Sequence, residues 1–183
     1  MVLLNPATWE DKNDAEPIIN CRKNTEIPNI FAICFGIGVE TIHHWNTYAS
    51  GISGCCIEFD EIKLLNSFRQ KEGIRYGDVE YKRISEVTRN KPKFNKIPFL
   101  KRYPYQCEKE FRIIWEGETN SKAVEFDIDL CSINKITLNQ EMPDTIVDVI
   151  KGLCKEVSGR ALKINRSTLY QNEKWILALK IEG

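Results

Sequence analysis

The chain contains 183 residues, and its 26 lysine and arginine residues balance its 26 aspartate and glutamate residues. This length suits one well-buried domain, and the zero net charge argues against a protein whose whole surface attracts nucleic acid or an anionic membrane. Because the sequence shows neither a signal-peptide pattern nor an apolar run of membrane-spanning length, we expect a cytoplasmic protein with no membrane contact.

The first half of the sequence alternates between apolar runs and capped helical segments. We expect a short helix that ends near Asn20, a strand at residues 31–35 that ends at Gly36, and a helix from Thr41 to Ala49. The pattern then predicts a strand at residues 55–60, a helix at residues 61–71 and a strand at residues 73–84 that is interrupted at Gly77.

The second half predicts a helix at residues 97–106 that leads into a strand beginning at Glu108. Further expected elements are strands at residues 123–128, 133–138, 160–165 and 175–181, and an amphipathic helix at residues 144–157. Strands and helices mix without strict alternation, which is typical of an α+β fold. We therefore predict a single domain over residues 1–183, with a mixed or mainly antiparallel sheet and flanking helices.

The cysteines predict a reducing compartment. There are seven, and the odd number without a C-x-x-C pair predicts neither a disulfide framework nor a zinc site. Reduced thiols are typical of the cytoplasm, and several of these cysteines, such as Cys34 and Cys55, are best interpreted as small core residues. A catalytic cysteine would need a histidine, and the sequence offers only His43 and His44. We predict no metal ligands among the candidate site residues.

The most informative segment of the sequence is residues 108–115. Read as a strand, it places Phe111, Ile113 and Trp115 on one face. The other face then carries Glu108, Glu110 and Arg112, and two carboxylates about 7 Å apart suit work on one small substrate. The alternative is a solvated face on which Arg112 pairs with Glu110.

Basic residues concentrate between Lys82 and Arg102, where the local balance strongly favours positive charge and aromatic residues are interleaved. We predict a basic loop at about residues 86–98. Such a segment suits contact with a phosphate backbone and stacking on bases, and the candidate nucleic-acid ligands are Lys91, Lys93, Lys96 and Lys101. The alternatives are a solvated loop or attraction to the acidic stretch that follows it.

Five short motifs follow one another along the chain, in this order: Trp9-x-Asp11-x-x-Asp14-x-Glu16, Cys34-Phe35, Trp45-x-x-Tyr48-Ala49, Gly54-x-Cys56-x-Glu58-Phe59-Asp60 and Glu108-x-Glu110-Phe111-Arg112. Over roughly residues 3–155 this order resembles the uncharacterised bacterial domain-of-unknown-function family numbered 2971. The resemblance implies kinship of fold and carries no activity. It also suggests a bacterial conflict setting, as a toxin or a phage-defence effector.

The Glu108-x-Glu110 pair also resembles the catalytic strand of ADP-ribosyltransferases. That resemblance implies that NAD is used, that Glu110 stabilises the cationic ribosyl centre as nicotinamide departs, and that Glu108 activates the acceptor. Arg112 completes the candidate catalytic row, and the expected cofactor contacts are Phe35, Trp45 and Tyr48. The alternative for Trp45 and Tyr48 is that they pack their helix onto the sheet.

Two other classes of function remain open. Asp60 followed by Glu80-Tyr81-Lys82 is similar to the carboxylate and lysine arrangement of magnesium-dependent nucleases. A third class is a non-catalytic recognition or regulatory module that binds nucleic acid or a partner protein, including a partner that completes the sheet at an unpaired edge.

Overall fold

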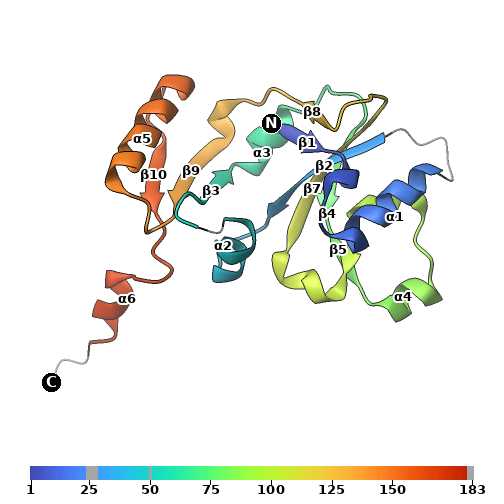
Figure 1. Ribbon diagram of the computed structural model, residues 1–183, viewed down its shortest axis with the longest axis horizontal. Helices are drawn as coiled ribbons and strands as arrows, with labels where there is room; N and C mark the ends of the chain where they lie inside the picture. Colours follow the sequence, from blue (N-terminus) through green and yellow to red (C-terminus); the bar gives the residue numbers. More distant parts are fainter. Residues whose placement is uncertain (24–28, 50, 181–183) are drawn as a thin grey trace. The chain divides into compact units, whose positions relative to one another are not determined.

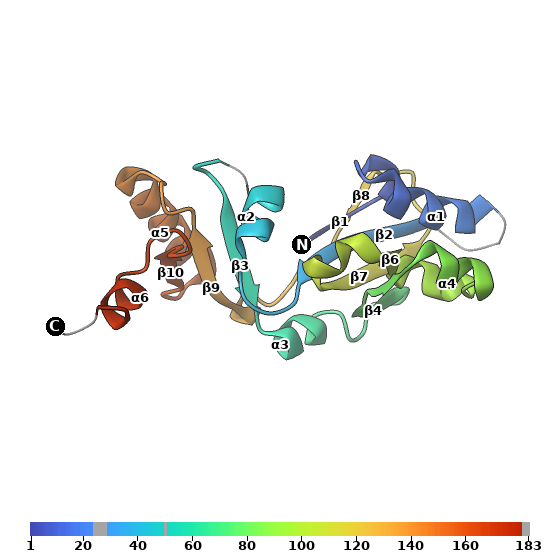
Figure 2. The same cartoon turned by 90° about the horizontal axis from the view of Figure 1, so that it is seen from below.

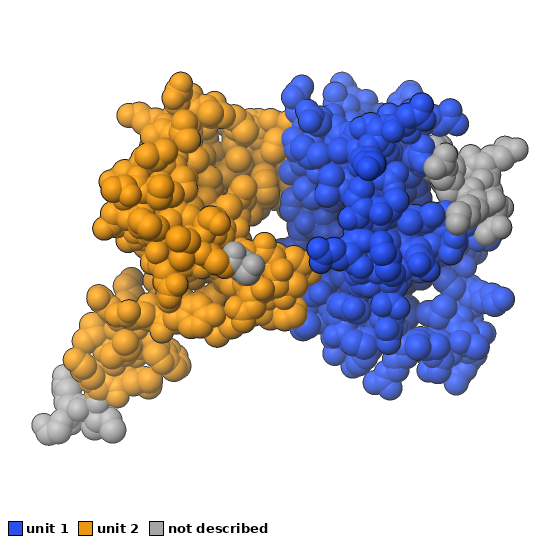
Figure 3. Space-filling view, viewed as in Figure 1, with its two compact units in different colours: residues 1–38, 68–127 blue, residues 39–67, 128–183 orange. Residues whose placement is uncertain are grey.

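A computed structural model describes residues 1–23, 29–49 and 51–180 of the chain. The chain divides into two compact units, residues 1–38 with 68–127 and residues 39–67 with 128–183, which Figure 3 colours separately. The prediction of a single domain over residues 1–183 stays a prediction. In the described residues, no helix has both the length and the apolar character needed to cross a membrane.

The first unit is built on a five-stranded antiparallel sheet in the order β4-β7-β2-β1-β8. These strands are β1 (Val2–Leu4), β2 (Asn29–Gly36), β4 (Ile74–Asp78), β7 (Glu110–Gly117) and β8 (Ala123–Glu125). A separate parallel pair joins β5 (Glu80–Lys82) to β6 (Leu100–Arg102). The predicted strand at residues 73–84 is thus two strands, and the break falls at Val79 instead of Gly77.

Helices cover one face of this sheet. The helices of this unit are η1 (Pro6–Thr8), α1 (Lys12–Lys23), α4 (Ile84–Arg89), η2 (Phe94–Phe99) and η3 (Tyr103–Glu108). α1 runs alongside β2 in Figures 1 and 2, whereas no residue of α4 is buried. Ile18 of α1 packs on Ala32 and Ile114 of the sheet, with Trp9 and Phe99 against the same cluster. Removal of these apolar side chains from water holds α1 on the sheet.

The opposite face of the sheet carries an aromatic core. The Phe31 and Trp115 ring centroids lie 5.6 Å apart, and Phe126 lies 6.2 Å from Trp115 and 5.8 Å from Phe68. Phe31 and Phe68 are fully buried, so these rings supply a large apolar area. The alternation predicted for residues 111–115 is confirmed for this face.

The second unit has a three-stranded sheet in the order β10-β9-β3. Its strands are β3 (Cys55–Phe59), β9 (Ile133–Leu138) and β10 (Lys163–Arg166), and its helices are α2 (Ile42–Tyr48), α3 (Glu61–Asn66), η4 (Leu130–Ser132), α5 (Asp144–Ser158) and α6 (Glu173–Ala178). β9 and β10 are parallel because α5 crosses between them, and α5 lies beside both in Figures 1 and 2. Val147 of α5 packs on Ile136 and Leu138.

The α+β class and the mainly antiparallel sheet are confirmed. The helix after Thr41 is also confirmed, because the Thr41 hydroxyl accepts a hydrogen bond from the His44 N–H at 3.2 Å. The helix predicted at residues 61–71 is shorter and ends at Asn66. The sequence interpretation missed β1, whose three residues are too few to show a period.

Three predictions of local structure were wrong. The predicted helix at residues 97–106 is η2, β6 and η3, because Pro98 and Pro104 lack the N–H that a continuous helix needs. The predicted basic loop at residues 86–98 contains the end of α4 and most of η2. The strand predicted at residues 175–181 is replaced by α6, which Asn172 caps by accepting the Trp175 N–H at 3.0 Å; residue 181 lies outside the described residues.

Two glycines predict opposite effects on stability. A Cβ at Gly54 would stand 2.1 Å from the Ala49 carbonyl oxygen, whereas a Cβ at Gly152 in α5 would meet nothing within 4 Å. Gly54→Ala should therefore lower the free energy of unfolding by about 1–3 kcal/mol, and Gly152→Ala should raise it by roughly 0.5–1 kcal/mol because alanine favours a helix. Urea unfolding followed by circular dichroism measures both, and shifts of the same sign would contradict the structure.

Candidate functional site

Five charged side chains gather on the helix-covered face of the first unit's sheet. At most 8% of each side chain is exposed, and Arg112 is fully buried. They come from α1, β6, η3 and β7, and we call them the buried charge cluster: Asp14, Lys101, Glu108, Glu110 and Arg112. Charges are rarely buried unless they are paired, so their partners decide what this cluster does.

The chain turns sharply between the two glutamates. Lys109 adopts the left-handed conformation with φ of 45°, so Glu108 ends η3 and β7 begins at Glu110. The prediction that the strand begins at Glu108 was therefore wrong. The turn brings the carboxylates closer than a straight strand would: the Lys101 ammonium donates to Glu108 Oε2 at 2.6 Å and to Glu110 Oε1 at 2.7 Å.

Arg112 joins the helix layer to the sheet. Its guanidinium donates in fork geometry to Asp14, with Nη1 3.1 Å from Oδ1 and Nη2 2.8 Å from Oδ2. Nη2 also donates to Glu110 Oε2 at 2.8 Å, and Nη1 donates to the Pro98 carbonyl at 2.9 Å. The guanidinium carbon lies 5.3 Å from the Trp9 ring centroid, a cation–π distance. One side chain thus ties β7 to α1, η1 and η2.

The pKa values in the cluster are set by burial on one side and by hydrogen bonds and neighbouring charges on the other. Burial opposes ionisation of Glu110, but the hydrogen bond with Glu108 and the charges of Arg112 and Lys101 outweigh it and lower its pKa to about 2. For Asp14 burial dominates, so its pKa is raised despite the nearby Arg112. Hydrogen bonds to Glu108 and Glu110 outweigh burial at Lys101 and raise its pKa. Glu110 is therefore an anion and Lys101 a cation at neutral pH.

Residues 108–112 had two interpretations, a catalytic row and a solvated face with an ion pair, and the structure agrees with part of each. It brings the predicted catalytic residues Glu108, Glu110 and Arg112 together. The pairing of Arg112 with Glu110, expected on a solvated face, is also present, but both side chains are buried. The sequence interpretation missed Asp14 and Lys101 as members of the cluster. A signal for Asp14 existed, since it lies four residues before buried Ile18 and so shares its helix face.

The predicted cofactor contacts are divided between the two units. Phe35 pairs with Phe111 and lies on the opposite face of the sheet from Glu110, which pairs with Gly36. Trp45 belongs to the second unit, where it is 6% exposed and its indole N–H donates to Glu40 Oε2 at 2.7 Å. This burial agrees with the packing alternative for Trp45. Tyr48, on the same helix, is 61% exposed.

Most cations of the predicted basic segment point outward. Exposed cations and two exposed aromatic rings form what we call the basic surface: Arg83, Arg89, Lys91, Lys93, Lys96, Arg102, Phe94 and Tyr103. The Arg83 guanidinium lies 4.7 Å from the Tyr103 ring centroid. Of the four predicted nucleic-acid ligands, Lys91, Lys93 and Lys96 belong to this surface, whereas Lys101 points into the buried charge cluster.

The nuclease residues fall in both units. Asp60 caps α3 in the second unit and accepts the Lys63 N–H at 3.0 Å. Glu80 and Lys82 lie in β5 of the first unit and pair with each other at 3.2 Å. Across the residues that the structure describes, no group of three or more His, Cys, Asp or Glu side chains is placed to hold a metal ion. The nuclease interpretation stays a prediction.

Comparisons of the chain with protein-family models, with curated proteins and with solved structures found no match. The resemblances to the family numbered 2971 and to ADP-ribosyltransferases therefore stay predictions, and function has to be argued from the geometry.

The Glu110 pKa predicts a loss of stability in acid. Because the pKa is about 2 in the folded chain against an ordinary 4.5, the ionised carboxylate stabilises the fold above about pH 4.5, and this contribution is lost as the pH falls towards about 2. A pKa difference of this size corresponds to roughly 3 kcal/mol. In Glu110→Gln, this pH-dependent part of the free energy of unfolding should be absent. Urea unfolding measured between about pH 2 and pH 7 tests it.

Glu118→Gln, which changes an exposed carboxylate of the same unit, is the matched control and should keep the acid dependence of the wild type. The same pH dependence in all three proteins would show that Glu110 is not held as an anion by the cluster.

Proposed function

We propose that the first unit is a recognition module that binds single-stranded nucleic acid through its basic surface. One observation carries the proposal: the cations of the basic surface are exposed, whereas the two carboxylates that follow them in the sequence are buried. The acidic residues that follow the basic segment, Glu108 and Glu110, are buried and paired, whereas six cations between Arg83 and Arg102 are exposed. The carboxylates therefore do not neutralise the surface.

The residue types of the basic surface suit a single strand. Lysine and arginine side chains pair with phosphates and release the counterions that surround them, which favours binding at low salt. Exposed Phe94 and Tyr103 offer ring faces for stacking, and a stacked base contributes about 1–3 kcal/mol irrespective of its sequence. Glu86, the acid within this stretch, already accepts the Arg83 N–H at 2.7 Å.

The buried charge cluster positions this surface. Lys101 is the middle residue of β6, between exposed Lys96 of the preceding turn η2 and the adjacent, exposed Arg102. Because Lys101 is held by two carboxylates, the flanking turns η2 and η3 are fixed on the sheet. The seven free thiols suit a reducing compartment such as the cytoplasm, where we expect the protein to act.

Neutralising three lysines of the basic surface tests this function. In Lys91→Gln/Lys93→Gln/Lys96→Gln, the affinity for a fluorescent oligothymidine should fall at least tenfold at low salt, in a fluorescence-anisotropy titration. The slope of log affinity against log salt should decrease by about 2, because each phosphate contact to a single strand contributes about 0.7.

The matched control removes the same charge from exposed lysines of the second unit, as Lys151→Gln/Lys155→Gln/Lys174→Gln. This control should bind as the wild type does. Equal losses in both triple variants would indicate a net-charge effect and would contradict a localised binding surface.

A second candidate is an ADP-ribosyltransferase-like reaction with NAD as the substrate. It is favoured by the convergence of Glu108 and Glu110 on one cation at the start of a central strand. In this reaction the bond between ribose C1′ and nicotinamide breaks, and nicotinamide leaves with the electron pair. The acceptor then bonds to C1′ and gives its proton to Glu108, while Glu110 stabilises the cationic ribose. Lys101 has to leave the carboxylates for this to occur.

The second candidate predicts release of nicotinamide from NAD by the wild-type protein. Glu110→Gln should slow that release about 100-fold or more, since the loss of one electrostatic contact to a transition state costs this much. Chromatography of the products measures the rate, and Glu118→Gln is the matched control. No release by the wild type, or an equal rate in Glu110→Gln, would reject the transferase.

A further inference from the structure

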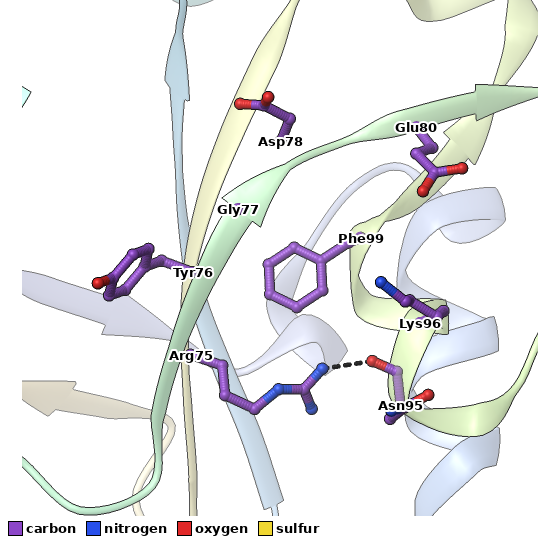
Figure 4. Close-up of a pocket in the computed structure, with 8 residues that line it drawn as sticks. All are labelled: Arg75, Tyr76, Gly77, Asp78, Glu80, Asn95, Lys96 and Phe99. Carbon is purple, nitrogen blue, oxygen red and sulfur yellow. Dashed lines mark hydrogen bonds between the residues drawn. The ribbon is translucent and has the colours of Figure 1, made fainter.

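The cavity of about 450 Å³ between β4, β5 and η2 of the first unit surrounds a ring that is already packed (Figure 4). Phe99 contacts the apolar cluster that contains Ile18 and Ile114. The Arg75 guanidinium carbon lies 5.3 Å from the Phe99 ring centroid, and a Cβ on Gly77 would lie 4.0 Å from Cδ1 and Cε1 of the ring. This ring therefore serves the packing of its own unit. The second unit differs, because large apolar side chains of β3, α5 and α6 are exposed there.

α5 covers β9 and β10 more fully than it covers β3. Val147 of α5 packs on Ile136 and Leu138 of β9, and Ile164 of β10 packs against the same cluster. Ile57 of β3 is the register partner of Ile136, so its side chain points to the face of the sheet on which α5 lies. Ile57 is nevertheless exposed. The part of this face over β3 is thus apolar and open to water.

One edge of α5 continues this apolar surface. Its exposed apolar side chains are spaced three and four residues apart and so share one edge of the helix: Ile146, Val149, Leu153 and Val157. Asp144, about half a turn around the helix from Ile146, pairs with Arg166 of β10 at 2.7 Å. The polar edge of α5 therefore faces β10, and the apolar edge faces β3. We call Ile57 and the four side chains of this edge the α5–β3 face.

The α5–β3 face has the dimensions that a second helix needs. Packed helices lie about 8–10 Å apart, whereas neighbouring strands lie about 4.8 Å apart. A helix packed beside α5 would therefore be displaced by about two strands, from the position of α5 over β9 and β10 towards β3.

α6 is a helix of the same unit without a buried residue. Trp175, Ile176, Leu177 and Leu179 are all exposed, and consecutive positions point in different directions around a helix axis. A helix that is apolar on all sides is normally buried. The cap from Asn172 already satisfies the Trp175 N–H at 3.0 Å, so α6 is a formed helix with an apolar surface that suits packing against another apolar face.

The chain leads α6 away from the α5–β3 face of its own copy. The Tyr170 hydroxyl, just before α6, donates to Asn46 Oδ1 of α2 at 3.5 Å. Burial and the charge of Glu40, close before α2, raise the pKa of the Cys56 thiol, which points to the opposite face of β3 from Ile57. α2 and α5 thus lie on opposite faces of the sheet, and Figures 1 and 2 draw α6 apart from α5.

We propose that the second unit forms a homodimer by exchange of α6, in which α6 of each copy packs beside α5 on the α5–β3 face of the other. A second copy supplies both surfaces, and a two-fold axis then makes each contact twice. The apolar side chains of the α5–β3 face and of α6 are 45–73% exposed. They present on the order of 900 Å² per chain, similar to the roughly 800 Å² that each partner contributes to a stable interface.

The test measures the mass of the full chain at micromolar concentration by size-exclusion chromatography with light scattering. The wild type should have twice the mass of one chain. Leu153→Glu on the α5–β3 face and Trp175→Glu on α6 should each raise the dimer dissociation constant at least tenfold, because each places a carboxylate in an apolar contact. Lys151→Glu, on the polar edge of α5, is the matched control and should dimerise as the wild type does.

A mixture of the two variants tests the exchange itself. Leu153→Glu keeps an intact α6 and Trp175→Glu keeps an intact α5–β3 face, so the two chains together should form a heterodimer that neither forms with itself. Recovery of the dimer would also show that both variants are folded. Val149→Gln and Leu177→Gln repeat the test should circular dichroism show that a glutamate variant is unfolded.

Three results would overturn the exchange of α6. They are a monomeric wild type, a folded variant of either surface that dimerises as the wild type does, and a mixture of folded variants that stays monomeric. The first result would also show that α6 finds its partner within its own chain or not at all. Binding of oligothymidine decides none of these outcomes, because the inference concerns the second unit and does not rest on the proposed function.

Discussion

The buried guanidinium of Arg112 holds the first unit together. It reaches α1 through Asp14, η2 through the Pro98 carbonyl and its own strand through Glu110. Desolvating a guanidinium costs several kcal/mol, and only complete pairing offsets that cost. Loss of one partner from such an arrangement typically costs 3–5 kcal/mol because the remaining charge stays buried. The helix layer is therefore held in the position that gives the two terminal nitrogens of Arg112 their acceptors, whereas the buried Nε has no hydrogen-bond partner among the described residues.

The same pairing separates two adjacent cations of β6. Lys101 completes the cluster from β6, and because side chains alternate along a strand, its neighbour Arg102 points outward. The Pro98 carbonyl accepts from Arg112, and this fixes the backbone just before Phe99. Gly77 is the register partner of Arg112 across β4 and β7. The basic surface is thus positioned by contacts with the buried charge cluster.

The recognition module and the transferase require different states of Lys101. In the first, Lys101 stays between Glu108 and Glu110 and acts as a structural cation, at 2.6 and 2.7 Å. In the transferase, a cationic ribose takes the place of Lys101 between Glu108 and Glu110. The low dielectric of the interior, which strengthens the ion pairs of Lys101, would then strengthen the attraction between the ribose and these carboxylates. The arrangement of the described residues favours the first state, because every carboxylate of the cluster already has a cation within ion-pair distance.

The sequence by itself determined the features that depend on near neighbours. The helix cap at Thr41, the alternation of Phe111, Ile113 and Trp115, and the α+β class follow from short-range patterns that the structure confirms. Tertiary structure decided the rest. Asp14 and Arg112 are 98 residues apart, and Lys101 points inward although its residue type suits a surface. Pairing in the interior depends on which elements fold over the sheet, and that information is absent from local sequence. Residues 173–178 illustrate this dependence on tertiary structure. They are apolar enough for a strand, but no described strand pairs with them, and they form α6.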